Sequence, residues 1–230
     1  MIKKDFDNII MKNSMLGELK LKKMGEHVKY IVKNSIPGDI VELGVWKGGC
    51  AAWIGQLLLE GKDPRVLHLF DSFEDPPEPL PIDGEKVVRK MGGVNHAHGR
   101  LIPSVGYYKN LGLGGPGNAD EVLKLMTVDI GYKEENTKIY KGWIQETVPE
   151  ASQKIGVVSL LILDCGLYEA TKLCIEAFYD KVSPKGVIVV DDYEVYAGCK
   201  KAIDDFLYSR KLNPKLIRVN KKDCIYWVKD

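Results

Sequence analysis

Residues 39–49 read DIVELGVWKGG, and this stretch decides the fold class. Its first half is a short apolar strand that ends in an acid, Glu42, and a glycine, Gly44. Its second half contains the glycine pair at 48–49, from which a helix is expected to start. The sequence IPG at 36–38 separates this unit from a helical region before it. A strand that passes through a glycine turn into a helix is the first unit of an α/β fold.

The rest of the chain alternates strands with helices in the same way. Several of the strand segments are apolar throughout, which is typical of parallel strands covered on both faces. We expect strands at 66–70, 138–140, 160–164 and 187–190, helices at 8–34, 49–60, 119–131, 168–180 and 198–210, and a terminal hairpin from 217–219 and 224–228. The pattern predicts a doubly wound, mostly parallel α/β sheet with helices on both faces and an antiparallel C-terminal hairpin.

The domain organisation follows from length and local composition. A chain of 230 residues fits one α/β domain with one sizeable core, so we expect a single domain over 1–230. Residues 1–35 form a helical extension before the first strand. Residues 75–118 are rich in proline and glycine and read as an irregular, lid-like insertion.

Charge and composition exclude several classes of protein. Lys and Arg (33) nearly balance Asp and Glu (32), which argues against a dedicated nucleic-acid binder. No apolar run approaches the roughly 20 residues that span a bilayer, and the N-terminus lacks the apolar stretch of a signal peptide. The five cysteines are odd in number and form no CxxC pair, so a disulfide framework or zinc knuckle is not expected. We expect a cytoplasmic protein with no membrane or nucleic-acid partner.

Four of the expected strands end in acidic residues, namely Glu42, Asp71, Asp164 and the pair Asp191-Asp192. The ligand of an open α/β sheet lies outside the carboxyl ends of its strands, so these carboxylates should meet at one edge. Gathering carboxylates is costly without cations or hydrogen-bond donors. Their convergence therefore indicates a functional site.

The glycine loop after the first strand and Asp71 after the second indicate a nucleoside ligand. Glycines allow a ligand to approach the backbone, and an acid at the second strand end commonly accepts ribose hydroxyls. The loop does not have the GxGxxG spacing of a dinucleotide site. The alternative interpretation is an ordinary turn and helix N-cap.

Asp164, Asp191 and Asp192 suit a hard divalent cation with oxygen ligands, such as Mg²⁺. The alternative is that one carboxylate caps a helix while another, Asp192 above all, is merely solvated.

Beyond these residues, the chain resembles the macrocin O-methyltransferase family, which acts on sugar hydroxyls of macrolide and aminocoumarin antibiotics. The motifs occur in family order from residue 38 to the C-terminus. The resembling segments are 38–49 (GDIVELGVWKGG), 70–74 (FDSFE), 141–143 (KGW), 147–149 (TVP), 163–171 (LDCGLYEAT), 183–186 (SPKG), 191–193 (DDY), 198–199 (GC) and 226–227 (YW).

The resemblance implies a seven-stranded class I methyltransferase sheet that binds S-adenosylmethionine over its first two strands. It assigns cofactor contacts to Glu42, Gly44 and Gly48 on the methionine side, Asp71 and Ser72 at the ribose, Gly142 and Trp143 near the adenine, and Asp164. It also assigns Mg²⁺ to Asp164, Asp191 and Asp192. The metal would bind the acceptor hydroxyl, lower its pKa and orient it towards the methyl group.

One position departs from the family pattern. The family usually reads Asp-Gly-Asp-Leu-Tyr where this chain reads DCGLY at 164–168, so Gly166 replaces an acid proposed as the general base. Another residue could serve as the base, the acceptor hydroxyl could be more acidic, or the chain could bind cofactor without methylating anything. The candidates for the base are Glu169, Glu194, His96 and His98, and Asp164 is the central catalytic residue.

Four tyrosines could stack on a sugar or a planar acceptor, or could simply be half-buried; they are Tyr107, Tyr108, Tyr193 and Tyr196. The resulting prediction is a magnesium-assisted O-methyltransferase for a hydroxyl of a small molecule, on a sugar or a glycosylated natural product. The alternatives are an inactive, cofactor-binding relative and a nucleotide-sugar or dinucleotide enzyme. We also expect a homo-oligomer.

Overall fold

The computed structural model describes residues 8–85, 106–219 and 224–230, and within them seven strands form one sheet. The strand order is β3-β2-β1-β4-β5-β7-β6. The strands are β1 (Asp39–Leu43), β2 (Leu67–Asp71), β3 (Thr137–Lys141), β4 (Val158–Leu163), β5 (Val182–Val190), β6 (Ile217–Arg218) and β7 (Ile225–Val228). Strands β1 to β5 pair in parallel, whereas β7 pairs antiparallel with both β5 and β6. The predicted doubly wound sheet with an antiparallel C-terminal pair is confirmed.

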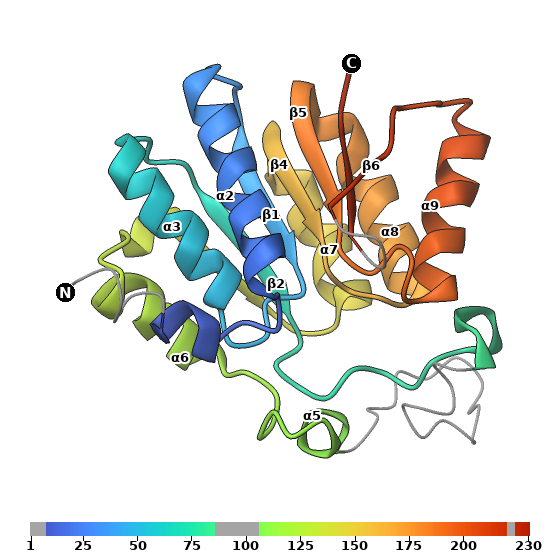
Figure 1. Cartoon of the computed structure of the whole chain (residues 1–230), viewed down its shortest axis with the longest axis horizontal. Helices are drawn as coiled ribbons and strands as arrows, with labels where there is room; N and C mark the ends of the chain where they lie inside the picture. Colours follow the sequence, from blue (N-terminus) through green and yellow to red (C-terminus); the bar gives the residue numbers. More distant parts are fainter. Residues whose placement is uncertain (1–7, 86–105, 220–223) are drawn as a thin grey trace.

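Helices cover both faces of this sheet (Figure 1). One face carries α2 (Glu18–Lys33), α3 (Gly49–Gly61) and α6 (Ala119–Lys124), and the other carries α7 (Ile144–Lys154), α8 (Tyr168–Phe178) and α9 (Ala197–Ser209). The shorter helices are η1 (Pro81–Asp83), α5 (Tyr107–Asn110), η2 (Leu125–Asp129), η3 (Glu134–Asn136) and η4 (Tyr179–Lys181). None of the helices in the described ranges is both long and apolar enough to cross a membrane.

Alternation along each strand divides the buried side chains between two cores. In β1, Ile40 packs in the core under α2 and α3, whereas Val41 and Leu43 pack in the core under α7, α8 and α9. In β4, Ile162 belongs to the first core and Leu161 to the second. This is why the central strands are largely apolar: successive side chains point to opposite faces, and both faces are covered.

The mostly helical region expected over 8–34 consists of two helices separated by a turn. Residues 8–12 are helical, a turn follows, and α2 begins only at Glu18. Within the turn the Leu16 amide donates to the Ser14 hydroxyl, and the Gly49 amide of α3 donates to the Asn13 carbonyl at 2.8 Å. The break is therefore fixed by a tertiary contact with α3, which the helical spacing of the sequence does not show.

The sequence pattern does not predict helix α7, because Pro149 lies inside it and two β-branched residues precede the proline. The buried side chains of Val148 and Ala151 hold α7 against the sheet. The predicted helix at 119–131 changes to a π-helical segment after Lys124.

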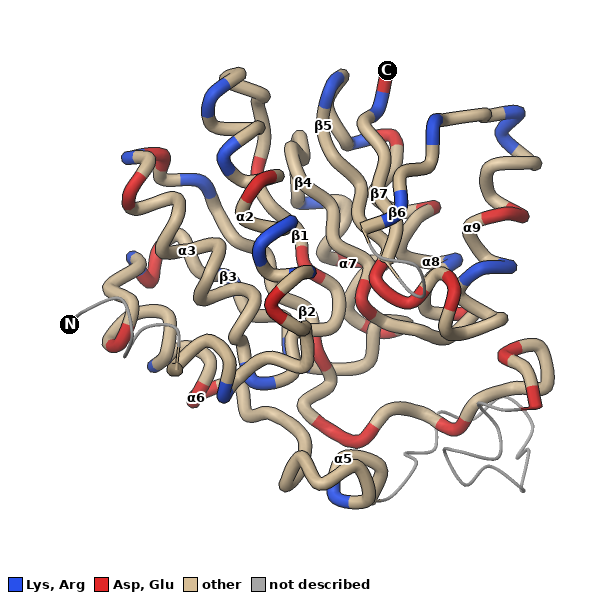
Figure 2. The backbone as a smooth tube through the Cα atoms, viewed as in Figure 1, with Lys and Arg blue, Asp and Glu red and all other residues tan. Residues whose placement is uncertain are grey.

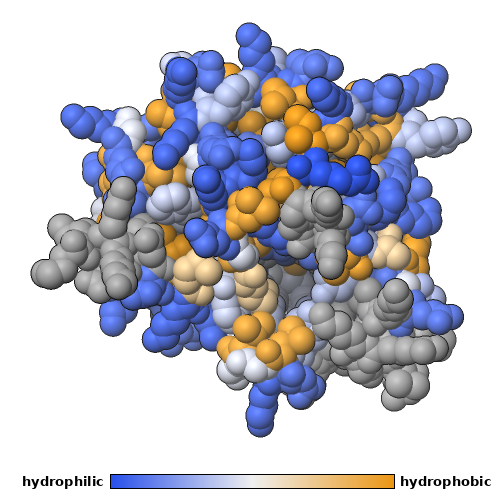
Figure 3. All heavy atoms as spheres, viewed as in Figure 1, coloured by the Kyte–Doolittle hydropathy of each residue, from blue (hydrophilic) through white to orange (hydrophobic). Residues whose placement is uncertain are grey.

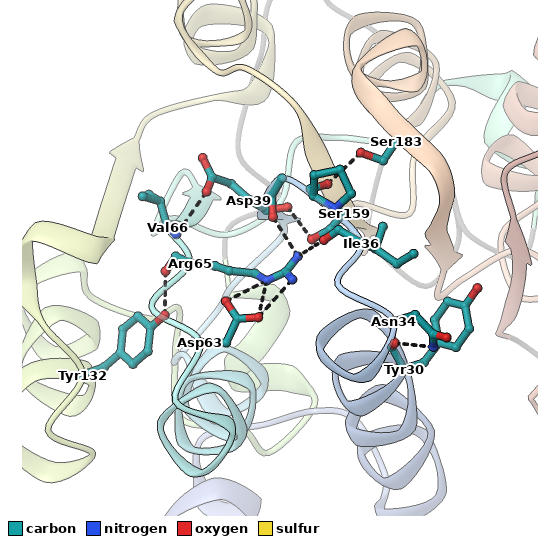
Figure 4. A network of polar contacts seen from close by, with 12 residues as sticks. Tyr30, Asn34, Ile36, Asp39, Asp63, Arg65, Val66, Tyr132, Ser159 and Ser183 are labelled. Atoms are coloured by element: carbon teal, nitrogen blue, oxygen red, sulfur yellow. Dashed lines mark hydrogen bonds and ion pairs between the residues drawn. The ribbon is translucent and has the colours of Figure 1, made fainter.

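A polar network closes the amino-terminal edge of the sheet, opposite the carboxyl ends of the strands (Figure 4). The Arg65 guanidinium donates to the carbonyls of Ile36 (2.6 Å) and Gly38 (2.9 Å) and pairs with Asp63. The Tyr132 hydroxyl in turn donates to the Arg65 carbonyl at 2.6 Å. These contacts tie loops together, and they indicate a structural role for this edge.

Acid should destabilise the protein through His27. Its imidazole is buried on α2 beside the Tyr226 ring (4.3 Å between centroids), and its Nε2 atom has no hydrogen-bond partner within the described part of the chain. Burial lowers the pKa of His27 to about 4. Between pH 6.5 and 4 the His27 imidazole is protonated in the unfolded chain but not in the folded chain, so the free energy of unfolding falls as the pH falls.

Urea denaturation should show that wild type loses about 3 kcal/mol more of its free energy of unfolding than His27→Leu does over this range. A difference between the two proteins that stays constant from pH 7.5 to 4 would contradict this role.

Candidate active site

The acidic strand ends converge at the carboxyl edge of the sheet, as the sequence predicts. Figure 2 shows acidic positions following the lower ends of the central strands, where the carboxyl ends lie. The strand order reverses direction between β1 and β4, so a crevice is expected beyond these two strands. Glu42 and Asp71 stand on one side of this crevice, and Asp164, Asp191 and Asp192 follow β4 and β5 on the other.

Two adjoining cavities occupy this edge, one of about 360 Å³ and one of about 50 Å³. The smaller reaches Glu42 and Cys50, and the larger reaches Trp143, Asp192 and Tyr196. The residues that line both cavities are Met15, Leu16, Gly44, Asp71, Tyr108 and Asp164. The two cavities therefore meet beside Asp164, and one ligand can extend from the smaller cavity into the larger one, where a second ligand can lie next to it.

Glu42 presents an unpartnered acceptor to the smaller cavity. Its side chain is 2% exposed, and within the described residues its Oε2 atom has no hydrogen-bond partner. Burial raises the pKa of Glu42 to about 8, and the neighbouring Asp71 adds to this, while a hydrogen bond from Cys50 opposes it. A buried carboxylate without a donor is costly, so this position fits a cationic ligand group such as an ammonium.

Asp71 connects the two loops that border the smaller cavity. Its Oδ2 atom accepts the amides of Val45 and Trp46, each at 2.8 Å, and Oδ1 accepts the amide of Phe73 at 2.7 Å. Burial raises the pKa of Asp71, and the three backbone donors oppose that rise. Each carboxylate oxygen has two lone pairs, so Asp71 can hold both loops and still accept a ligand hydroxyl.

The carboxylates of Asp164, Asp191 and Asp192 form a compact cluster. One oxygen of each lies within 4.8 Å of the others. Burial raises the pKa of Asp164 well above its ordinary value, and the neighbouring Asp191 and Asp192 carboxylates add to this rise, while Lys20 opposes it. Lys20 reaches the cluster from α2, with Nζ 2.7 Å from Asp191 Oδ2. Three clustered carboxylate ligands fit a hard divalent cation.

Two tyrosines, Tyr107 and Tyr196, lie beside Gly166, where the family usually has an acidic residue. Gly166 has a φ of 64°, and a Cβ there would lie 3.2 Å from Asp192 Oδ2 and 3.4 Å from the Tyr196 ring. The Tyr196 hydroxyl lies 3.1 Å from that of Tyr107. An acidic side chain at 166 would meet both another carboxylate and a ring, so the glycine and the tyrosine fit each other.

The remaining predicted cofactor residues separate into two groups. Ser72 and Trp143 line the larger cavity, and their contacts with the cofactor stay predictions. Gly48 instead caps α3 with a φ of 82°, where a Cβ would press on Val122. Gly142 begins the turn before α7, and a Cβ there would meet Thr147 at 3.0 Å.

Of the predicted bases, the two that the structure describes, Glu169 and Glu194, line neither cavity. Glu169 is exposed on α8, and Glu194 is exposed and paired with Arg218 at 2.6 Å. His96 and His98 lie outside the described residues. Tyr193, one of the four tyrosines considered for stacking, is buried and donates to Asp204 instead.

Three residues that line the site or support it are not singled out by the sequence pattern. Lys20 lies in a helix rich in lysines, Asp75 lies in an acidic, proline-rich run, and Cys50 resembles any buried thiol. Lys20 and Asp191 are 171 positions apart, so only the folded chain brings them together.

Asp83 anchors the start of the insertion beneath the cavity. Its Oδ1 atom accepts the Tyr168 amide at 2.7 Å, and Oδ2 accepts the Leu80 amide at 2.8 Å. A Cβ at Gly198 of α9 would lie only 1.9 Å from Asp83 Oδ1, so the helix can pass only without a side chain.

Gly198→Ala should therefore displace Asp83 and lower the free energy of unfolding by about 3 kcal/mol. The matched control is Gly156→Ala, because nothing lies within 4 Å of a Cβ there and the expected change is under about 1 kcal/mol. Urea denaturation of both variants would measure the difference, and equal stabilities would contradict the tight passage.

Known proteins of similar sequence and structure are O-methyltransferases. The sequence model of the macrocin-O-methyltransferase family matches residues 3–96 and 121–229.

Two relatives of known activity match most of the chain. A demethyldecarbamoylnovobiocin O-methyltransferase from Streptomyces niveus is 29% identical over 216 residues, which are 94% of this chain and 75% of the relative. An 8-demethyl-8-(2,3-dimethoxy-alpha-L-rhamnosyl)-tetracenomycin-C 4'-O-methyltransferase from Streptomyces olivaceus is 28% identical over 195 residues, 84% of this chain and 67% of the relative. The solved structure of the O-methyltransferase NovP has a TM-score of 0.75 at 27% identity, over 94% of this chain and 82% of NovP. The chain therefore belongs to the macrocin-O-methyltransferase family and is an S-adenosylmethionine-dependent O-methyltransferase.

Proposed function

We propose that the protein transfers a methyl group from S-adenosylmethionine to a sugar hydroxyl of a glycosylated natural product, with the help of Mg²⁺. The observation that carries this proposal is the junction of the two cavities at Asp164. The Glu42 carboxylate, whose Oε2 atom has no partner among the described residues, lies at one end, and the carboxylate cluster lies at the other. Donor and acceptor can each be bound by charge and still meet at the junction.

The cofactor's amino group would pair with Glu42, because that carboxylate has no donor on Oε2 among the described residues. The ribose would lie near Asp71 and Ser72, and the adenine near Trp143. Gly44 would give the cofactor access to the backbone after β1, since it lines both cavities. Gly48 and Gly142 would act by shaping their loops, since both adopt a positive φ.

Asp164, Asp191 and Asp192 would hold the metal, because they offer three oxygen ligands in one place. When bound, Mg²⁺ would polarise the acceptor hydroxyl and lower its pKa. Asp164 lines both cavities, so it would position the acceptor hydroxyl next to the cofactor. Lys20, on α2, forms an ion pair with Asp191 and so adds positive charge beside the carboxylate cluster.

No protein base is assigned among the described residues, because Glu169 and Glu194 are exposed away from the cavities. Activation of the hydroxyl would therefore rest on the carboxylate cluster and its cation, while His96 and His98 stay predictions. The sugar hydroxyl is proposed because the rhamnosyl-tetracenomycin relative carries such an acceptor in its name. Five free thiols, four of them buried, support the cytoplasmic location; the homo-oligomer stays a prediction.

The proposal is tested by S-adenosylhomocysteine formation from a panel of glycosylated natural products that includes demethyldecarbamoylnovobiocin and rhamnosyl-tetracenomycins, in Mg²⁺ and in excess chelator. We expect product only with a sugar hydroxyl and a divalent cation. Equal rates in chelator would overturn the metal's role. Turnover of phenols but not of glycosides would overturn the acceptor class, and no turnover at all would favour the inactive relative.

A further inference from the structure

The return limb of the insertion, residues 106–118, runs beneath the carboxyl edge of the sheet (Figure 1). Apolar side chains gather over α5 at the lower edge of the view in Figure 3. The family model matches residues 3–96 and 121–229, so this limb lies in the part of the chain that the match leaves out. The family match therefore does not assign a role to any residue of the limb.

Asp75 fixes the beginning of the limb. Its Oδ2 atom accepts the Gly106 amide at 2.7 Å, and its Oδ1 atom accepts the Tyr108 amide at 3.2 Å. Asp75 lines neither cavity, so its contacts with the limb are its visible role. A carboxylate that receives two backbone amides fixes the direction in which the chain leaves the turn.

The end of the limb is held by the loop between β1 and α3. The Trp46 indole donates to the Gly115 carbonyl at 3.1 Å, and the Lys47 ammonium donates to the Leu113 carbonyl at 2.9 Å. A Cβ at Gly117 would lie 1.7 Å from the Trp46 carbonyl oxygen, so backbone passes directly against backbone there. The limb is thus anchored at both ends.

Tyr108 is the limb's residue at the junction. It lines both cavities, together with Gly44, Asp71 and Asp164. Its ring centroid lies 5.3 Å from that of Tyr107 and 6.1 Å from that of Trp46. Burial raises the pKa of the Tyr108 hydroxyl, and the nearby Asp71 carboxylate adds to this, so the phenol stays neutral.

Tyr107 has a different environment. It lines the larger cavity only, and its hydroxyl lies against that of Tyr196 over Gly166. Two adjacent tyrosines therefore face two different parts of the site.

We propose that Tyr108 is a cofactor-binding residue supplied by the insertion, and that Asp75 positions it. The proposal rests on the S-adenosylmethionine site described above. A ring at the boundary covers apolar parts of the cofactor and excludes water from the junction, which favours binding through buried area. Asp75 acts only through the backbone amides that it holds, so its effect should depend on the ring at 108.

Calorimetric titration of S-adenosylhomocysteine tests both roles. Tyr108→Ala should raise Kd about tenfold, whereas Tyr108→Phe should stay within about threefold of wild type, because the ring is kept. Asp75→Ala should raise Kd about fivefold, and Asp75→Ala/Tyr108→Ala should bind no more than about twofold weaker than Tyr108→Ala alone. Tyr208→Ala is the matched control, since that tyrosine is 87% exposed on α9, and it should bind as wild type does.

Hydrogen exchange on the wild-type protein gives a second measurement that needs no variant. The amides of 106–110 should exchange more slowly once S-adenosylhomocysteine is bound. Unchanged exchange, wild-type affinity in Tyr108→Ala, or additive losses in the double variant would each overturn the inference. Failure of the wild-type protein to bind S-adenosylhomocysteine would instead overturn the proposed cofactor site itself.

Discussion

Glu42→Gln should weaken S-adenosylhomocysteine binding about 100-fold at pH 8, because the proposed cofactor site pairs the Glu42 carboxylate with the cofactor's ammonium. Gln is nearly isosteric with Glu, so the cavity keeps its shape and loses only the carboxylate. The Oε2 atom of Glu42 has no partner among the described residues, which leaves the ligand as the group that would satisfy it. A loss of this size is typical when one partner of a buried, hydrogen-bonded charge pair is removed.

The same substitution should stabilise the protein without ligand. Burial raises the pKa of Glu42 from 4.5 to about 8, so the folded state keeps a proton that the unfolded state has lost between these values. The stability contributed by this proton is complete below pH 4.5 and is lost as the pH rises to 8. Relative to Glu42→Gln, the wild-type protein should lose about 4 kcal/mol over this range.

Two measurements separate these effects from damage to the fold. Urea denaturation should show the variant gaining on wild type as the pH rises from 5 to 8. Calorimetry should show wild-type affinity for S-adenosylhomocysteine rising from pH 6 to 8, as Glu42 ionises, with little such rise in the variant. Glu150→Gln is the control, because Glu150 is an exposed carboxylate paired with Lys154. Parallel pH profiles for wild type and Glu42→Gln would show that this carboxylate does not meet the ammonium.

The part of the site that could be predicted follows from the geometry of parallel strands. Acids that end β1, β2, β4 and β5 must lie at one edge, because parallel strands present their carboxyl ends together. The order of residues along the chain is therefore enough to bring Glu42, Asp71 and the cluster around Asp164 to the same edge. The positions of the central strands can also be predicted, because both faces of the sheet are covered there and these strands are largely apolar.

The rest depends on contacts between distant segments. Lys20 reaches Asp191 across 171 positions, and Asp75 acts through amides 31 and 33 positions away. No local pattern marks such a residue, because its partner is chosen by the tertiary fold. The same holds for α7, where burial of Val148 and Ala151 outweighs the proline that argues against a helix in the sequence.

Asp164→Asn should abolish the proposed Mg²⁺ site and, through loss of that cation, lower the rate of methyl transfer about 1000-fold, which corresponds to the several kcal/mol that a bound cation supplies. Asn keeps one oxygen and the side-chain volume but loses the charge. Asp164 is the cluster member that lines both cavities, so its replacement affects the metal and the junction together. Asp205→Asn is the control, because Asp205 is a carboxylate of α9 that pairs with Lys201 outside the cluster.

Titration of Mn²⁺, followed by its electron paramagnetic resonance signal, measures the site without requiring an acceptor. Wild type and Asp205→Asn should bind one Mn²⁺ that Mg²⁺ displaces, and Asp164→Asn should bind none. If Asp164→Asn lost the metal but kept its methyl-transfer rate, the cluster would be a structural cation site, and activation of the hydroxyl would have to come from elsewhere. If it lost the rate but kept the metal, Asp191 and Asp192 would hold the cation by themselves. Asp164 would then serve the junction directly, as the one carboxylate of the cluster that both cavities share.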